Sequence, residues 1–165
     1  MPIDLYRIDD RLIHGQVVVG WGQPMNLGFI VLVDDEAAAS DWEQELYRMG
    51  VPAEMEVYFA SVDDAVRRVD EWRADRRHGL LLTGDIDTMR RFTDRATGVR
   101  AVNVGGIHHR VGRTERLRYL FLNADEERAL RTIEGRGIVV TAQDVPSAKP
   151  ARLDDLIDGT RAGAP

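Results

Sequence analysis

Five side chains that together could accept and hold a phosphoryl group fall within eight residues near the start of the chain. They are Arg7, Asp9, Asp10, Arg11 and His14. A neutral imidazole is a nucleophile, and guanidinium groups bind phosphate oxygens through charged hydrogen bonds. This combination is therefore what a histidine that carries a phosphoryl group requires.

The histidine falls at an expected strand-to-helix turn. An apolar-rich run predicts a strand over residues 3–8, and a mostly apolar stretch predicts a helix over 14–24. In α/β proteins the carboxyl ends of strands and the amino ends of the following helices form the ligand crevice, and such helix starts attract anions. A carboxylate would repel the phosphate, so Asp9 or Asp10 would instead orient the ring of His14 or the guanidinium of Arg11.

Each of these residues also has an ordinary structural interpretation. His14 could pack at the helix start, an aspartate could cap the helix, and Arg11 could form a surface ion pair. A cap needs only one such residue, so the concentration of charged groups favours the functional interpretation. We accordingly expect Arg11 to matter for phosphoryl transfer and not for folding.

Apolar runs alternate with helical patterns along the whole chain, which indicates β-α-β units and a mainly parallel sheet. The strands are expected at 3–8, 28–33, 55–60, 79–83, 100–104, 117–122 and 137–142. The helices are expected at 14–24, 37–49, 62–76, 86–96 and 124–135, with a short one at 153–158. These elements predict a three-layer α/β/α sandwich around a mostly parallel sheet of six or seven strands.

Length and composition limit the classes of function. A chain of 165 residues predicts a single domain over residues 1–158, followed by a flexible tail at 159–165. The net charge of −6 argues against nucleic acid as a partner, and the absence of cysteine excludes disulfides and thiolate metal sites. The sequence has no signal-peptide pattern and no apolar run of about 20 residues, so we expect a cytoplasmic location.

Two further segments are expected at the same sheet edge as His14. Thr83 ends the fourth expected strand, and Gly105 and Gly106 follow the fifth. The carboxyl ends of parallel strands share an edge, and paired glycines can bring backbone N–H groups close to an anion. The simpler alternative for the glycine pair is an ordinary turn.

Other motifs carry less information. His108 and His109 suggest a metal site, but adjacent histidines seldom point the same way and no further ligands complete a set. Gly20-Trp21-Gly22 lacks the third glycine of a dinucleotide fingerprint and lies well after the strand. The sequence contains no Walker motif and no Gly-x-Ser-x-Gly elbow.

The stretch Arg-Ile-Asp-Asp-Arg-Leu-Ile-His-Gly-Gln-Val at residues 7–17 closely resembles a family signature. It is similar to the IIB subunit of the mannose/fructose/sorbose family of the bacterial phosphoenolpyruvate-dependent sugar phosphotransferase system. Weaker similarity runs from Ile3 to about Ile157 and includes segments 33–36, 102–107 and 135–140. The adjacent histidines at 108 and 109 depart from the pattern of that family, which more often has an apolar or aromatic residue there.

The resemblance implies a role for each of these residues. His14 would accept a phosphoryl group from a histidine of the IIA subunit and pass it to a sugar entering through the membrane subunits IIC and IID. Arg11, three residues before the histidine, would contact the phosphate. We expect the phosphate pocket to include Asp9, Asp10, Gly15, Thr83, Gly105 and Gly106.

The same resemblance implies an enzyme class and a location. The chain would be a protein-N(π)-phosphohistidine–sugar phosphotransferase, acting in the cytoplasm at the inner membrane through IIC and IID. The scheme needs no metal or organic cofactor and no nucleic acid.

Two alternatives remain open at this point. The chain could be a IIB-like regulatory domain that senses phosphorylation without feeding a transporter. It could also bind a phosphorylated metabolite, with His14 donating only a hydrogen bond. The complete Asp-Asp-Arg-x-x-His-Gly motif favours a working carrier over the passive binder, but it does not separate a carrier from a regulator.

Overall fold

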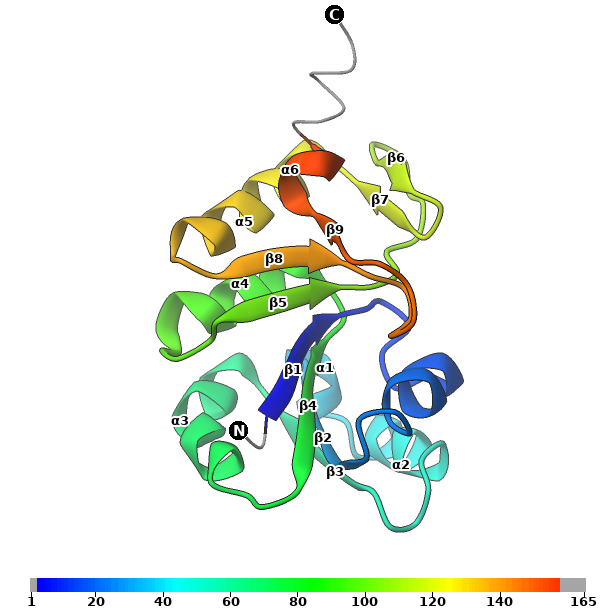
Figure 1. Ribbon diagram of the computed structural model, residues 1–165. Helices are drawn as coiled ribbons and strands as arrows, with labels where there is room; N and C mark the ends of the chain where they lie inside the picture. Colours follow the sequence, from blue (N-terminus) through cyan, green and yellow to red (C-terminus); the bar gives the residue numbers. More distant parts are fainter. Residues whose placement is uncertain (1–2, 158–165) are drawn as a thin grey trace, which may run out of the picture.

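The computed structural model describes residues 3–157, and at its centre lies a seven-stranded sheet in the order β3-β2-β4-β1-β5-β8-β9 (Figure 1). All neighbouring strands are parallel except β8 and β9, which are antiparallel. The strands are Ile3–Ile8 (β1), Leu27–Val33 (β2), Glu56–Ala60 (β3), His78–Thr83 (β4), Ala101–Val104 (β5), Val139–Ala142 (β8) and Ala151–Arg152 (β9). The predicted fold class is thereby confirmed.

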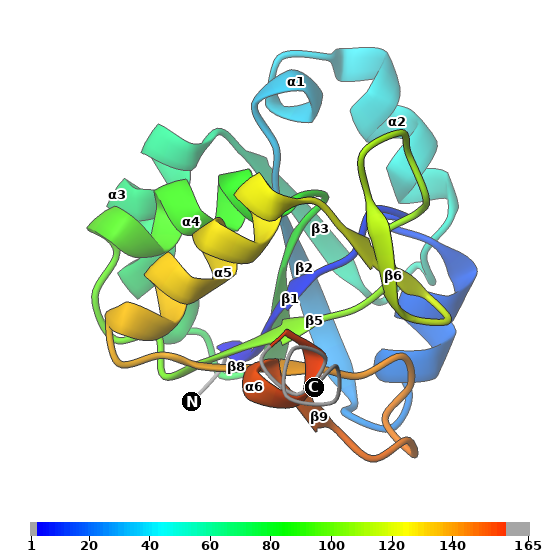
Figure 2. The ribbon, with the colours of Figure 1, turned by 90° about the horizontal axis from the view of Figure 1, so that it is seen from above.

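Helices cover both faces of the sheet and complete the three layers (Figure 2). One layer consists of Val62–Arg73 (α3), Ile86–Arg95 (α4) and Ala124–Gly135 (α5). The other contains the π-helix Gln16–Trp21 (η1) and Asp41–Met49 (α2), with the short helix Asp35–Ala38 (α1) after β2. A last helix, Leu153–Leu156 (α6), follows β9.

Strand β2 shows why its sequence is apolar at consecutive positions. Phe29 and Val31 belong to the core beneath α3, α4 and α5, whereas Ile30 and Leu32 belong to the core on the side of η1 and α2. All four side chains are fully buried. A strand covered on both faces has no polar side, so its sequence does not alternate.

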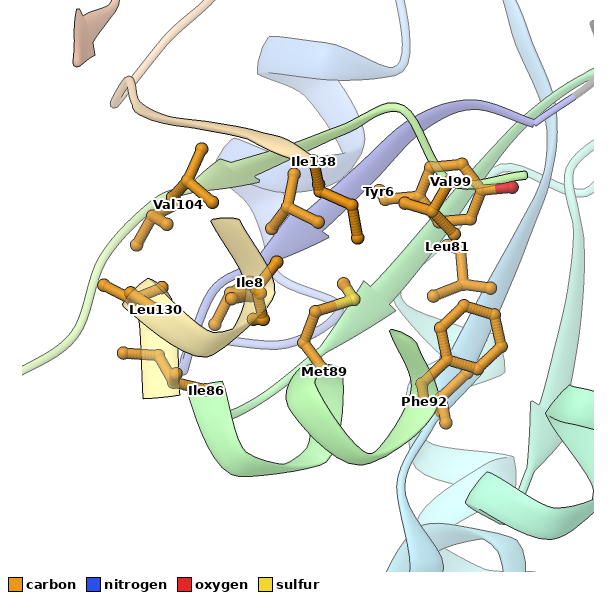
Figure 3. Close-up of a cluster of buried hydrophobic side chains, with 14 of the residues drawn as sticks. Tyr6, Ile8, Leu81, Ile86, Met89, Phe92, Val99, Val104, Leu130 and Ile138 are labelled. Atoms are coloured by element: carbon orange, nitrogen blue, oxygen red, sulfur yellow. The ribbon is translucent and has the colours of Figure 1, made fainter. Parts of the chain in front are cut away.

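The larger core holds the central strands in place. Ile8 of β1, Leu81 of β4 and Val104 of β5 lie in one buried cluster with Met89 and Phe92 of α4 (Figure 3). The three-residue spacing of the two α4 side chains places them on the face of the helix that meets the sheet. This packing fixes the positions from which the loops after β1, β4 and β5 begin.

The predicted strand at 117–122 is wrong as a member of the main sheet. It is instead part of a separate antiparallel hairpin, formed by Thr114–Leu117 (β6) and Leu120–Leu122 (β7). Leu117 pairs with Leu120, so the chain reverses within the predicted strand at Arg118 and Tyr119. The hairpin lies beyond the end of β5 (Figure 1).

Two helix predictions also differ from the structure. The expected helix 37–49 is two helices, because the Asp34 carboxylate caps α1 and the Ser40 hydroxyl accepts from the N–H of Glu43 at 3.3 Å to begin α2. The helix expected at 14–24 is the shorter η1, and β9 was not predicted. The end of the last expected helix, residue 158, and the expected tail at 159–165 lie outside the described residues.

The parallel strands end at one edge of the sheet, and β1 ends there between β4 and β5. The β6–β7 hairpin and the loop after β8 lie at the same edge (Figure 1). In open α/β sheets this position is where ligands bind. Among residues 3–157, no helix combines the length and the apolar character needed to cross a membrane.

A substitution at Gly79 would test how tightly the central strands are packed. A Cβ at this position would lie 2.1 Å from Cζ of Phe29, whose ring is fully buried and in edge contact with Tyr58. We expect Gly79→Ala to lower the free energy of unfolding by about 1–3 kcal/mol, measured by urea denaturation. Gly135→Ala at the end of α5 is the control, because nothing lies within 4 Å of its Cβ position, and it should be neutral or slightly stabilising. Equal stability of the two variants would contradict this account of the core.

Candidate functional site

The loop that follows β1 is hydrogen-bonded to both neighbouring strand ends. The N–H of Asp9 donates to the carbonyl of Thr83 at the end of β4, and the N–H of Asp10 donates to the carbonyl of Gly106 after β5, each at 2.9 Å. The loop therefore starts at a fixed position in the middle of the carboxyl edge.

A tight turn then redirects the chain toward η1. The N–H of Leu12 donates to the carbonyl of Asp9 at 3.0 Å, and Leu12 adopts a left-handed backbone with φ of 57°. Its side chain occupies the space that a Cβ of Gly84 would need, at 2.6 Å. Ile13 next enters the core beneath η1. The turn thus brings His14 to the surface directly before the helix.

His14 is exposed and lies at the amino end of η1. Its carbonyl accepts the N–H of Val18 at 2.9 Å, which begins the helical hydrogen bonding. Gly15 beside it is also exposed. A partner molecule can therefore approach the imidazole from solvent.

Arg7 is the most unusual residue of the site, because a long cationic side chain is completely buried. It donates to the Asn103 side chain and to the carbonyls of Gln143 and Asp144, at 2.9 and 3.1 Å for the two carbonyls. Its guanidinium carbon also lies 4.5 Å from the ring centre of Trp21, a cation–π distance. Arg7 thus joins β1 to β5, to the loop after β8 and to η1.

Asp9 is equally buried and lies between two arginines. Its Oδ2 accepts from Nη2 of Arg7 at 3.1 Å and from Nη2 of Arg11 at 2.6 Å, and its Oδ1 accepts from Nε of Arg11 at 2.8 Å. Burial raises the pKa of Asp9, but the hydrogen bonds and charges of Arg11 and Arg7 outweigh it and hold the pKa below 3.8. We call Arg7, Asp9 and Arg11 the Asp9 ion triad.

Arg11 has contacts within the fold as well as at the candidate site, which argues against the expectation that it matters for transfer and not for folding. Its side chain is 17% exposed. Three of its N–H groups, including the backbone one, donate to Asp9. The hydrogen bonds to Asp9 raise the pKa of Arg11, so the group stays fully charged.

Gly105 makes room for the Asp9 ion triad. A Cβ there would lie 2.2 Å from Nη2 of Arg7 and 2.5 Å from Oδ2 of Asp9. Its N–H donates to the carbonyl of Ile8 at 2.6 Å, so it serves the sheet edge and not an anion. Gly106 lies beside Arg11, with Nε 3.3 Å from its Cβ position. The glycine pair therefore accommodates the arginines, and the predicted anion contact stays a prediction for the N–H of Gly106.

Asp10 points away from the triad toward the loop before β6. Its Oδ2 accepts the backbone N–H of His108 at 2.7 Å, and its Oδ1 lies 2.7 Å from Nδ1 of the same histidine. His109 instead packs edge-on against Phe121, with ring centres 5.5 Å apart. Both adjacent histidines thus have local structural contacts. Among residues 3–157, no three potential metal-ligating side chains come together.

Thr83 is buried, and its hydroxyl donates to the carbonyl of Asp85 at 3.0 Å. It thereby shapes the turn between β4 and α4. A hollow of about 220 Å³ lies beside the loop after β1, lined by Asp10, Leu12, Asp34, Gly84, Asp85, Ile107, Arg110 and Arg113. A larger one of about 510 Å³ includes Glu56 and Val57 at the amino end of β3, away from this edge.

Four residues of the site were not predicted as members. They are Trp21, Asn103, Gln143 and Asp144, all of which contact Arg7. A signal existed only for Asn103, a polar residue within the otherwise apolar strand β5. The other three gave no local pattern.

Comparisons with known proteins match this chain over nearly its whole length. The family model described as "PTS system sorbose subfamily IIB component" matches residues 3–164. The mannose-specific EIIAB component of Escherichia coli K12 is 31% identical over 158 residues, and the chain spans 49% of that relative, about half its length. The N-acetylgalactosamine-specific IIB component 1 of the same organism is 30% identical, with 92% of this chain and 96% of the relative covered.

Solved structures agree with the fold. The IIBSor domain of the sorbose permease from Klebsiella pneumoniae superposes with a TM-score of 0.87 at 26% identity, covering 97% of this chain and 98% of that domain. The structure of the N-acetylgalactosamine-specific IIB component 1 from E. coli gives 0.85 at 28% identity, covering 91% of this chain and 98% of that one.

A side chain introduced at Gly105 would test whether the Asp9 ion triad is tightly packed. We expect Gly105→Ala to lower the free energy of unfolding by about 1–3 kcal/mol, because the methyl group would push apart a buried ion pair. Gly106→Ala is the matched neighbour, and with its nearest contact at 3.3 Å it should cost less than about 1 kcal/mol. The measurement is the urea midpoint of each variant. A larger effect at Gly106 would show that the crowding has been assigned to the wrong glycine.

The ionisation of Asp9 predicts a pH dependence. Its folded-state pKa is depressed, so its contribution to stability is complete above the ordinary value of 3.8 and is lost as the pH falls through the folded-state value. We expect Asp9→Asn to cost about 3–5 kcal/mol at neutral pH, because two guanidinium groups lose their counter-charge. The difference from the parent chain should shrink below pH 3.8.

Urea unfolding at a series of pH values measures this difference. Asp125→Asn is the control, since that carboxylate is 85% exposed in a surface pair with Arg128, and it should change stability by less than about 0.5 kcal/mol. A penalty for Asp9→Asn that stays constant to the lowest pH would be incompatible with an ionised Asp9.

Proposed function

This chain belongs to the sorbose subfamily of IIB components of the sugar phosphotransferase system, and we propose that it carries the phosphoryl group on His14. The observation that supports this residue is an exposed histidine at a helix start, three residues after an arginine fixed by a buried carboxylate. Membership of the family supports a phosphocarrier role in sugar phosphorylation.

The first step transfers the phosphoryl group from a phosphohistidine of a IIA protein. The lone pair of an unprotonated ring nitrogen of His14 forms the new N–P bond as the N–P bond of the donor breaks, and that electron pair returns to the donor nitrogen. The imidazole must be neutral at the attacking nitrogen. Arg11 and the helix start stabilise charge on the equatorial oxygens, in keeping with catalysis by positioning and electrostatics.

The Asp9 ion triad supplies the positioning. Asp9 binds Arg11 through two side-chain hydrogen bonds, so the guanidinium keeps one orientation before the phosphate arrives. Arg7 balances the charge of Asp9 from the buried side. Pre-organised charge of this kind needs little rearrangement during the reaction.

The second step delivers the group to a sugar. A sugar hydroxyl oxygen forms a P–O bond, the N–P bond of His14 breaks, and the hydroxyl proton is lost to a base or to water. We propose that the sugar is presented by membrane IIC and IID subunits, which would place the chain at the cytoplasmic face of the inner membrane. The reaction is that of a protein-phosphohistidine–sugar phosphotransferase.

Labelling identifies the carrier residue. Incubation with phosphoenolpyruvate, the general phosphotransferase proteins and a IIA protein should label the parent chain, and the label should be lost in acid and survive alkali. His14→Gln keeps hydrogen-bonding capacity but has no imidazole nucleophile, so it should remain folded and accept no label.

The other histidines at this edge are the matched controls. His108→Gln and His109→Gln should still be labelled, because these side chains contact Asp10 and Phe121 respectively. An acid-stable label, or one that persists in His14→Gln, would overturn the proposal in favour of a passive binding domain.

A further inference from the structure

The loop after β8 brings a second carboxylate to Arg11. Oδ1 of Asp144 lies 3.6 Å from Nη2 of Arg11, close enough for strong attraction but beyond a normal hydrogen bond. Among residues 3–157 this oxygen has no hydrogen-bond partner, although it is buried. The side chain as a whole is 39% exposed. Such a carboxylate attracts Arg11 without fixing its orientation, which Asp9 already does.

The position of this carboxylate is set by its backbone. The carbonyl of Asp144 accepts from Nη2 of Arg7 at 3.1 Å and from the indole Nε1 of Trp21 at 3.3 Å. The preceding residue, Gln143, is bound through its N–H to the carbonyl of Val104 at 2.9 Å. These backbone contacts therefore keep the Asp144 side chain near Arg11.

The charged side chains around Arg11 balance one another. Arg7 and Arg11 provide two positive charges, and Asp9 and Asp144 provide two negative charges. The remaining nearby acid, Asp10, is directed to His108. A phosphoryl group adds between one and two negative charges. When Arg11 binds that group, Asp144 becomes a like charge beside it.

We propose that Asp144 competes with the phosphoryl group for Arg11 and so keeps the phosphorylated form from becoming too stable. The inference rests on the proposed function, in which His14 carries the group next to Arg11. A carrier has to release its phosphoryl group, and contacts that stabilise the phosphorylated ground state more than the transition state slow that release. Asp144 thus acts through the charge of Arg11 and not through contact with the reacting atoms.

Inorganic phosphate provides a first test. Asp144→Asn removes the charge while it keeps the size of the side chain and the backbone that binds Arg7 and Trp21. We expect inorganic phosphate to bind this variant roughly fivefold more tightly, the factor that corresponds to about 1 kcal/mol for a partly exposed charge pair. The binding is followed in a phosphate titration through the backbone N–H resonances of His14 and Gly15, which every variant retains.

Two further variants separate competition from other effects. Asp154→Asn in α6 removes a carboxylate that also pairs with an arginine, Arg131 of α5, at 2.8 Å, and it should leave phosphate affinity unchanged. In an Arg11→Ala background, Asp144→Asn should no longer raise the affinity, because the two groups act through the same guanidinium. Unchanged or weaker phosphate binding by Asp144→Asn would overturn the inference, since a carboxylate that merely supports Arg11 would lower the affinity when removed.

The phosphorylated protein gives the second measurement. The chain is equilibrated with a phosphorylated IIA protein, and the share of label on each partner is determined. Asp144→Asn should shift this equilibrium about fivefold toward phosphorylated His14, in step with the phosphate affinity. Labelling of His14 without any shift would contradict the role of Asp144 and leave the proposed function intact. An absence of label on His14 in every variant would instead overturn the proposed function, and the inference with it.

Discussion

A carboxylate buried between two guanidinium groups constrains the architecture of this site. Asp9 has no access to water, so its charge has to be compensated by Arg7 and Arg11 at hydrogen-bonding distance. Arg7 in turn is fully buried and needs acceptors beyond Asp9. It obtains them from β5 and from the loop after β8. The charge of Asp9 thus requires β1, β5 and the loop after β8 to meet at Arg7.

The rest of the edge follows from that compensation. β5 must carry an asparagine where its neighbours are apolar. A glycine must follow the strand, because a methyl group at Gly105 would overlap the ion pair. η1 must present Trp21 to the guanidinium of Arg7. The reactive turn itself remains at the surface, since Ile13 anchors it from below and His14 faces outward. A rigid interior thereby supports an accessible residue, which suits a protein that exchanges a group with successive partners.

Features set by neighbouring residues in the chain could be predicted from the sequence, whereas contacts between segments far apart in the chain could not. Consecutive apolar residues predicted the buried parallel strands, and the clustered charges of residues 7–14 indicated the site. The hairpin was missed because an apolar run does not reveal a reversal at Arg118 and Tyr119. Gln143 and Asp144 were missed for a different reason. They serve Arg7 largely through backbone carbonyls, which every residue has, so their side-chain types carry no signal.

The distance along the chain between Arg7 and its acceptors has a consequence for biosynthesis. The two carbonyls that bind this guanidinium lie 136 and 137 positions later in the sequence. A ribosome therefore produces the turn that holds His14 long before the groups that complete its support. Until β8 has joined the sheet, the arginine lacks these acceptors and Asp144 is absent from Arg11. The site is thus completed only after both segments have been synthesised and β8 has paired with β5, so this loop and its support cannot fold as a local unit.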